Sequence, residues 1–111
     1  MIQIRISRTA DGDISGFTMQ GHAQFADKGK DIVCAGVSAV AFGSLNAVIA
    51  LTPIEPDITI EEDGFLKCSL SQPLEGEGNK QVQLLLEGMI VSLQTIEREY
   101  PEYVKIKFMK S

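Results

Sequence analysis

The chain contains no tryptophan, a single histidine and only two cysteines among its 111 residues. Two cysteines, and a strand pattern that starts directly after Met1 instead of an export signal, indicate a reducing compartment, so we expect a cytoplasmic protein without disulfide bonds. One histidine and two cysteines without a CxxC spacing fall short of a closed zinc site. We therefore expect neither a metal ion nor another cofactor.

The chain also lacks an excess of positive charge. It has ten Lys and Arg residues and fifteen Asp and Glu residues, for a net charge of −5. This balance argues against binding nucleic acid, which needs clustered cations, and favours a basic partner. A hydrophobic content of 44% with 23% charged residues, and no low-complexity tract, is typical of a folded chain. We predict one domain over residues 1–111.

Long hydrophobic runs are rare, and the exception is residues 32–54, which carry no charge and are long enough to cross a membrane. The run is interrupted by small and polar residues, namely Gly36, Ser38, Gly43, Ser44 and Asn46. Its flanks carry acidic as well as basic residues, and the neighbouring strands need a cover. We therefore interpret the run as a core helix and expect no membrane association.

Five segments alternate apolar and polar residues with the period of a half-buried strand: 2–9, 14–20, 57–62, 65–70 and 103–108. Asp11-Gly12 and Asp63-Gly64 are hairpin signals between the first two and the next two segments. The alternation directs Ile60, Cys68 and Phe108 towards the core. Cys68 is accordingly interpreted as a buried apolar residue.

Two helices are predicted between these strands. The first begins at Asp31 and ends before Pro53, and because it is apolar almost all round we expect the sheet, the second helix and a partner subunit to enclose it. The second begins at Asn79 as its N-cap and ends at Pro101. The order ββαββαβ predicts an α+β fold, a two-layer sandwich of two helices on a mixed sheet.

Cys34 and His22 are the candidate catalytic pair. Cys34 falls in the first turn of the predicted helix, where unpaired N–H groups and the helix dipole favour a thiolate and can donate to an oxyanion. His22 follows a strand and precedes a loop that allows it to reach the cysteine as general base. The alternative is a solvated or capping histidine beside an ordinary buried cysteine.

Three further residues are candidate supports for this pair. Asp31 is either the helix N-cap or a carboxylate that orients the imidazole of His22. Ser38 lies one turn after Cys34, where its hydroxyl contacts the sulfur or a substrate, or else bonds back to the preceding turn. Gly21 gives the loop freedom to fold back over the helix.

Two sequence motifs, which contain His22 and Cys34, resemble those of a known family. "GHA" at residues 21–23 and "DIVCAGVSAV" at residues 31–40 are similar to the ribosomal-processing cysteine protease Prp family. The resemblance continues through "FGSLNAVIAL" and "VSLQTIEREYP", and the long loop near Gly76 is less characteristic. It therefore covers most of the chain.

The resemblance implies a homodimeric cysteine protease with Cys34 as nucleophile and His22 as general base. Its implied substrate is large-subunit ribosomal protein twenty-seven of Firmicutes and related bacteria, cut after an aromatic residue to remove an N-terminal extension during ribosome assembly. The resemblance also implies that loop 23–30 moves to admit this substrate.

Two other functions remain open at this stage. A protein with this fold but without catalytic activity would be a ribosome-assembly factor that binds a ribosomal protein. A small thiol hydrolase or transferase with a non-peptide substrate would use the same cysteine, because the residues alone do not specify a peptide.

Overall fold

The computed structural model describes residues 1–27, 30–62, 64–71 and 75–110. Its elements are β1 (Ile2–Arg8), β2 (Ile14–Gln20), α1 (Ile32–Leu51), β3 (Asp57–Glu61), β4 (Phe65–Ser69), α2 (Gly76–Glu99) and β5 (Val104–Lys110). This order confirms the predicted ββαββαβ arrangement. Asp63 of the predicted second hairpin lies outside the described residues.

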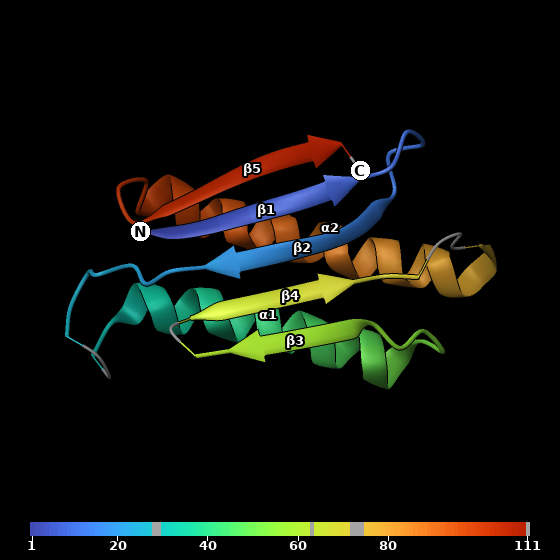
Figure 1. Cartoon of the computed structure of the whole chain (residues 1–111), viewed down its shortest axis with the longest axis horizontal. Helices are drawn as coiled ribbons and strands as arrows, with labels where there is room; N and C mark the ends of the chain where they lie inside the picture. Colours follow the sequence, from blue (N-terminus) through green and yellow to red (C-terminus); the bar gives the residue numbers. More distant parts are fainter. Residues whose placement is uncertain (28–29, 63, 72–74, 111) are drawn as a thin grey trace.

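The strands form one mixed sheet in the order β3-β4-β2-β1-β5. β1 and β5 run parallel, whereas the other neighbouring strands are antiparallel. Both helices lie on one face of the sheet, as Figure 1 shows, and they pack against each other. The predicted α+β two-layer sandwich is therefore confirmed, and no helix of the described residues lies on the opposite face of the sheet.

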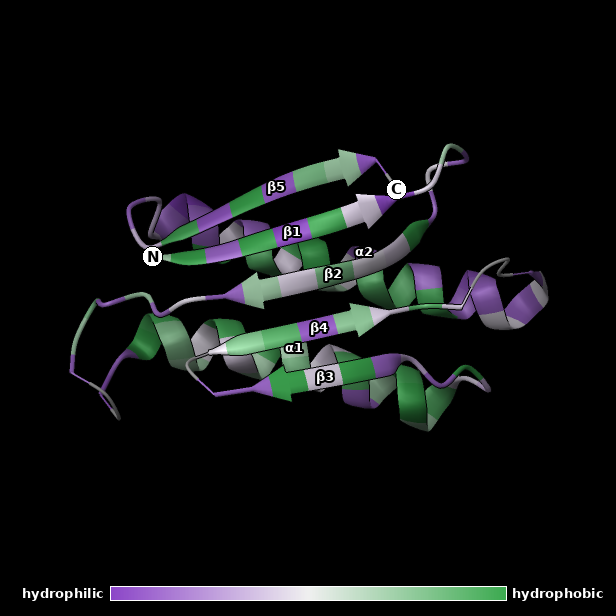
Figure 2. Cartoon of the chain, in the orientation of Figure 1, coloured by the Kyte–Doolittle hydropathy of each residue, from purple (hydrophilic) through white to green (hydrophobic). Residues whose placement is uncertain are grey.

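The hydrophobic core lies between the sheet and the helix layer. Alternate residues of the central strands are buried in it, including Ile4, Ile6 and Phe17, and meet Val37 of α1 and Leu86 of α2. Figure 2 shows the alternation of hydrophobic and hydrophilic residues along β1 and β5, and the almost continuous hydrophobic colour of α1. Alternation in the strands thus separates a core face from a polar face.

Helix α1 begins and ends where the sequence predicts. Asp31 is its N-cap, and Thr52 precedes Pro53 at its end. The residues that it buries are Val33, Val37, Ala41, Leu45 and Val48. By length and composition α1 could cross a membrane, but this buried stripe packs within the core.

Three residue predictions in the fold are wrong. Helix α2 begins at Gly76, so Asn79 lies inside the helix, and its Nδ2 donates to Asp13 Oδ2 at 3.1 Å. Ile60 is 62% exposed because it lines an open pocket. Phe108 is 50% exposed near the end of the edge strand β5, and the Arg8 guanidinium lies 5.4 Å from its ring centroid.

Polar contacts fix α2 to the β1–β2 hairpin. Arg8 donates to both carboxylate oxygens of Glu87, at 2.6 and 2.8 Å. Gln83 accepts from the N–H of Ile14 at 2.7 Å and donates to its carbonyl at 2.9 Å. These contacts set how α2 lies on the sheet, and therefore where the turn after α2 meets the loop before α1.

Candidate active site

Cys34 lies in the first turn of α1, as the sequence predicts. Its sulfur accepts a hydrogen bond from the N–H of Ala23, with the nitrogen 3.2 Å from Sγ. The 20-residue helix directs the positive end of its dipole at the same sulfur. Both features place positive electrostatic potential at the sulfur, so the position suits a nucleophile.

Asp31 joins the helix to the preceding loop. One carboxylate oxygen, Oδ1, accepts from the N–H groups of Val33 and Cys34, both at 3.0 Å. The other, Oδ2, accepts from the N–H of Phe25 at 3.0 Å and of Ala26 at 3.5 Å. These donors, led by the N–H of Cys34, hold the pKa of the carboxyl below its ordinary value.

The geometry of Asp31 corrects one expectation and favours another. Because Asp31 occupies the N–H groups of Val33 and Cys34, the expectation that these groups serve as oxyanion donors is wrong for the structure as it stands. The capping role is observed directly. Among the described residues, Asp31 makes no hydrogen bond to His22, so the orienting role receives no support from the contacts.

Two glycines set the position of His22. Gly21 has φ +97°, and a Cβ on it would lie 2.5 Å from the carbonyl oxygen of Met1. Gly64, in the β3–β4 hairpin, has φ +74°, and a Cβ there would lie 2.7 Å from the carbonyl oxygen of Gly21 and 3.1 Å from His22 Cε1. The exposed imidazole therefore lies close against this hairpin.

His22 and Cys34 line the same pocket, together with Ser38. The pocket has a volume of about 160 Å³, and apolar residues supply most of its wall: Ile2, Met19, Val37, Phe42, Ile60, Phe65 and Leu66. Glu61 is the carboxylate among its lining residues. The space suits one apolar side chain beside a reactive sulfur.

Side-chain contacts within the pocket are few. The hydrogen bonds of the described residues include none between the His22 imidazole and the Cys34 sulfur, and none made by the Ser38 hydroxyl. Catalytic contacts are often longer without substrate and close on binding, so the shared pocket is the relevant observation. The hydroxyl of Ser38 is available to a bound ligand, because it does not bond back to the preceding turn.

Loop residues next to His22 are held by an aromatic cluster. The ring of Phe25 meets the rings of Tyr100 and Tyr103 edge to face, with centroids 5.5 and 5.2 Å apart. Gln24, between Ala23 and Phe25, has φ +60°, which costs energy in a residue with a side chain. The cluster and Asp31 together hold this strained segment with Ala23 against the sulfur.

The second cysteine, Cys68, is buried on β4 as predicted and is not among the residues that line this pocket. Burial raises the pKa of its thiol from 9.0 to about 11. A thiol in this state is a poor nucleophile at neutral pH. The structure therefore separates a cysteine that lines the pocket, Cys34, from one that is buried in the core, Cys68.

Sequence reasoning did not identify Phe25, Gly64 or the N–H of Ala23 as parts of the site. The aromatic partners of Phe25 come about 75 positions later in the chain, so no local pattern connects them. Gly64 was identified only as a turn residue. The apolar pocket residues carried a helix or strand signal and no signal of a ligand.

Comparison with known proteins shows which family the chain resembles. The family described as cysteine protease Prp matches residues 1–105 of the chain. The ribosomal processing cysteine protease Prp of Bacillus subtilis strain 168 is 50% identical over 107 residues, which are 96% of each chain. The Prp of Staphylococcus aureus strain Mu50 is 43% identical over 110 residues, 97% of this chain and 99% of that one.

Solved structures agree with these sequence matches. The chain is similar to the Prp protease of S. aureus in complex with a covalently linked product peptide, with a TM-score of 0.89, 41% identity, and coverage of 97% of this chain and 99% of that chain. The same S. aureus protease in complex with a substrate peptide gives a TM-score of 0.83 at 40% identity, with the same coverage. The similarity therefore extends over nearly the whole of both chains.

Proposed function

The chain belongs to the Prp family of cysteine proteases, which act in ribosomal processing, and from this membership we propose a specific substrate and mechanism. The proposed substrate is large-subunit ribosomal protein twenty-seven, from which the enzyme removes an N-terminal extension. The acidic chain, with a net charge of −5, attracts a basic ribosomal protein over long range.

The proposed chemistry uses Cys34 as nucleophile and His22 as general base. His22 takes the thiol proton, the sulfur attacks the peptide carbonyl, and His22 then protonates the leaving amine to give a thioester. A water molecule, activated by the same imidazole, hydrolyses the thioester. The single observation that carries this proposal is that both side chains line one pocket, with a backbone N–H on the sulfur.

The charge on the tetrahedral intermediate needs a donor other than the capped helix N-terminus. Asp31 already occupies the N–H groups of Val33 and Cys34. The N–H of Ala23 donates to Sγ before reaction, which makes it a backbone donor at the reacting centre. We assign the stabilisation of the oxyanion to this group, in addition to its effect on the thiolate.

The shape of the pocket supports cleavage after an aromatic residue. Its wall is mainly apolar and includes Phe42 and Phe65, which offer ring contacts to an aromatic side chain. Seating this side chain beside Cys34 places the following peptide bond at the sulfur. We also propose that loop 23–30, in which residues 28 and 29 lie outside the described part of the chain, moves to admit the extension. Phe25 ties the described part of this loop to the turn after α2.

We also propose that the protein is a homodimer. Helix α1 leaves large apolar side chains outside the core: Ile32 (60% exposed), Phe42 (37%), Ile49 (51%) and Leu51 (68%). Phe42 and Ile49 are seven residues apart on α1, which is about two turns, so they form a second stripe beside the buried one. A partner subunit on this stripe would remove it from water.

Mass spectrometry of the precursor tests the proposed function. We expect wild-type protein to shorten the precursor by one cut after an aromatic residue, and a folded Cys34→Ala variant to leave it intact. An intact precursor in both reactions would contradict the proposal in favour of a binding factor. Activity on small thioesters, with no cut in the precursor, would instead favour a thiol hydrolase.

A further inference from the structure

The face of the sheet opposite the helices carries a row of cations and hydroxyl groups. The row consists of one residue from each of the five strands, each paired with the next across the sheet: Lys107, Arg5, Thr18, Lys67 and Thr59. Neighbouring strands lie about 4.8 Å apart, so the row is continuous across the sheet. Three of its five side chains are positively charged, and none of its members is acidic.

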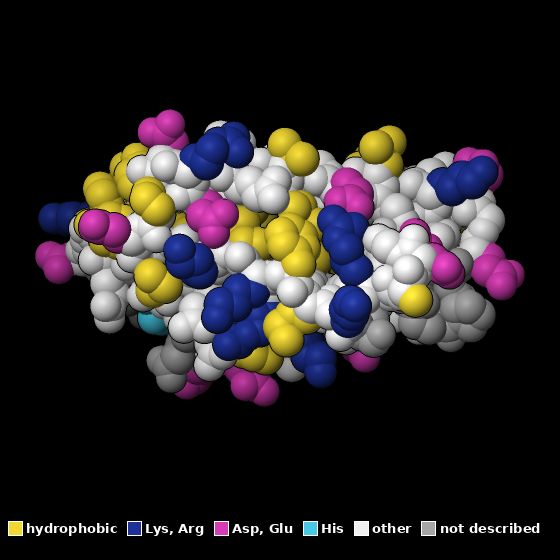
Figure 3. Space-filling view, turned by 90° about the horizontal axis from the view of Figure 1, so that it is seen from above, with side chains coloured by type: hydrophobic (Ala, Val, Ile, Leu, Met, Phe, Trp, Pro, Cys, Tyr) yellow, Lys and Arg dark blue, Asp and Glu magenta, His cyan; other side chains and the backbone are white. Residues whose placement is uncertain are grey.

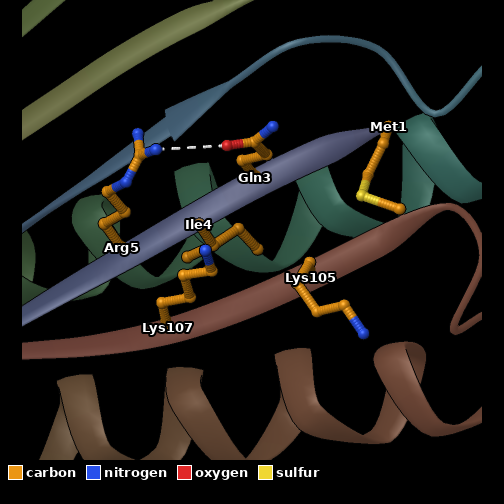
Figure 4. Close-up of a pocket in the computed structure, with 6 residues that line it drawn as sticks. All are labelled: Met1, Gln3, Ile4, Arg5, Lys105 and Lys107. Carbon is orange, nitrogen blue, oxygen red and sulfur yellow. Dashed lines mark hydrogen bonds between the residues drawn. The ribbon is translucent and has the colours of Figure 1, made fainter.

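A second row lies beside the first and extends the same chemistry. Lys105 pairs with Gln3, and Gln3 pairs with Gln20. Figure 4 shows Arg5 and Gln3 on β1 with Lys105 and Lys107 on β5, around a hollow of about 280 Å³. A further shallow hollow is lined by Arg5 and Lys67 with the hydroxyl-bearing residues Ser7, Ser15 and Ser69. The surface is therefore broad and basic, and Met109 is an exposed apolar side chain within it.

The four cations of these rows have no carboxylate partner. Arg5 donates to Gln3 Oε1 at 3.2 Å, and none of the four forms an ion pair among the described residues. Arg5 and Lys107 lie directly opposite each other across β1 and β5, where like charges are destabilising. An external anion that bridges them would remove this repulsion.

The net negative charge of the chain argues against binding nucleic acid, but the charges are unevenly distributed over the molecule. The chain is acidic overall, yet Arg5, Lys67, Lys105 and Lys107 gather on one face. Two acidic residues of the edge strand β3, Asp57 and Glu61, lie at the far edge of that face. Figure 3 shows several Lys and Arg side chains in the middle and lower middle of the view, with acidic side chains both beside them and at the margins.

We propose that this face, here called the basic sheet face (Arg5, Lys67, Lys105 and Lys107), binds the sugar-phosphate backbone of RNA. Cations repeated over a flat surface match an anion that repeats, and the intervening hydroxyl and amide groups can bond to phosphate and ribose oxygens. The two rows contain no aromatic residue on which a base could stack, so the contact is independent of base sequence. The choice of RNA over an acidic protein rests on the proposed ribosomal substrate. The inference that this face binds an anion does not depend on that substrate.

Fluorescence anisotropy with labelled RNA tests the proposal on the full chain. The probe is a 12-base-pair RNA duplex of mixed sequence, titrated at several salt concentrations. The test variant is Arg5→Gln/Lys107→Gln, and the control is Lys80→Gln/Arg98→Gln, which removes the same charge from α2. Thermal unfolding of both variants establishes that they fold, and cleavage of a precursor peptide in the absence of RNA tests the proposed function separately.

We expect wild-type protein to bind the duplex, with a Kd that rises steeply with salt. The Arg5→Gln/Lys107→Gln variant should bind at least about fivefold more weakly, and its slope of log Kd against log salt should be shallower by roughly 1.5 to 2. The control should change Kd by less than about twofold. Equal losses in the two variants, or no binding at low salt, would overturn the proposal. Equally tight binding of an acidic peptide of matched charge would also overturn it and make an acidic protein the occupant.

Discussion

At Asp31, one carboxylate serves two segments of the chain. Oδ1 caps the helix that carries Cys34, while Oδ2 holds the N–H groups of Phe25 and Ala26 in the loop. The residue therefore fixes the loop against the helix at the reactive sulfur. Its negative charge near Cys34 opposes a thiolate, which the dipole of α1 and the N–H of Ala23 favour.

Substitution at Asp31 separates its hydrogen bonds from its charge. Asp31→Ala should lower the Tm by a few degrees and the cleavage rate by about tenfold, because both the cap and the loop contact are lost. Asp31→Asn keeps a capping oxygen, so its rate should stay within about threefold of wild type. A large loss of rate in Asp31→Ala with an unchanged Tm would instead support an orienting role.

Acid unfolding gives a second measurement on the same variants. The folded pKa of Asp31 lies below its ordinary value of 3.8, so its contribution to stability is present above that pH and is lost as the pH falls through the folded pKa. Glu87, whose pKa is lowered from 4.5 by the hydrogen bond to Arg8, titrates in an overlapping range. The difference in Tm between wild type and Asp31→Asn should therefore shrink below about pH 4, and a constant difference would contradict this linkage.

Alkylation compares the two cysteines in one molecule. In native protein at pH 8, iodoacetamide should modify Cys34 and leave Cys68 free, because burial raises the pKa of Cys68 to about 11. In denaturant both should react. Between pH 9 and pH 11 the unfolded chain releases the Cys68 proton first, so stability should fall over that range. Peptide mapping checks the order, and labelling of Cys68 before Cys34 would contradict it.

Sequence and structure agree best at residues whose neighbours are close in the chain. Cys34 and Asp31 were identifiable because a helix N-terminus is a local feature. The role of Phe25 was not identifiable, because its partners Tyr100 and Tyr103 reach it only through the packing of α2. His22 lies between these cases, since its spacing from Cys34 was visible but its contact with Gly64 was not.

At the scale of elements, the first part of the loop before α1 is held by contacts at two nearby residues. Ala23 is buried against the sulfur, and Phe25 is held between two tyrosine rings. The strained Gln24 lies between them. Releasing Phe25 should therefore also loosen Ala23, and Cys34 would lose a donor that stabilises its thiolate.

Phe25→Ala tests this coupling. We expect the cleavage rate and the rate of Cys34 alkylation at one fixed pH to fall about fivefold, with a change in Tm of less than about 3 °C for one partly exposed ring. Phe108→Ala is the matched control, because that ring is also partly exposed and lies over Arg8. An unchanged rate of Cys34 alkylation in Phe25→Ala would show that the aromatic cluster does not act on the sulfur.

The types of the elements were predictable from periodicity, whereas their edges depended on packing. Strong alternation and the helical repeat identified all five strands and both helices. The start of α2 was wrong because Asn79 resembles a cap, whereas the helix begins at Gly76 and uses Asn79 to contact Asp13. Ile60 has the inward parity of a core residue, but it faces the pocket instead.

At the scale of the whole molecule, the order of strands could not be read from the sequence. The pairing of β1 with β5 joins the two ends of the chain, and no local signal specifies it. The same pairing builds the basic sheet face, because it brings Arg5 and Lys107 together. The apolar character of α1 predicted that the helix would have an apolar surface outside the core. It did not predict which residues would form that surface.

The proposed dimer depends on that surface. Ile49→Glu places a charge on the exposed stripe of α1 and should convert the dimer to a folded monomer in sedimentation velocity. Leu84→Glu is the control, because Leu84 is 75% exposed but belongs to the other helix, α2. A monomeric wild-type protein, or equal dissociation of both variants, would contradict an interface on α1.

The most direct test of the mechanism is the intact mass of the protein during turnover of a precursor peptide, quenched with acid at short times. We predict an added mass equal to the N-terminal fragment of the peptide, mapped to Cys34, and its absence in His22→Ala. Cleavage without any such adduct, or an adduct on Cys68, would contradict the assignment of Cys34 as the nucleophile.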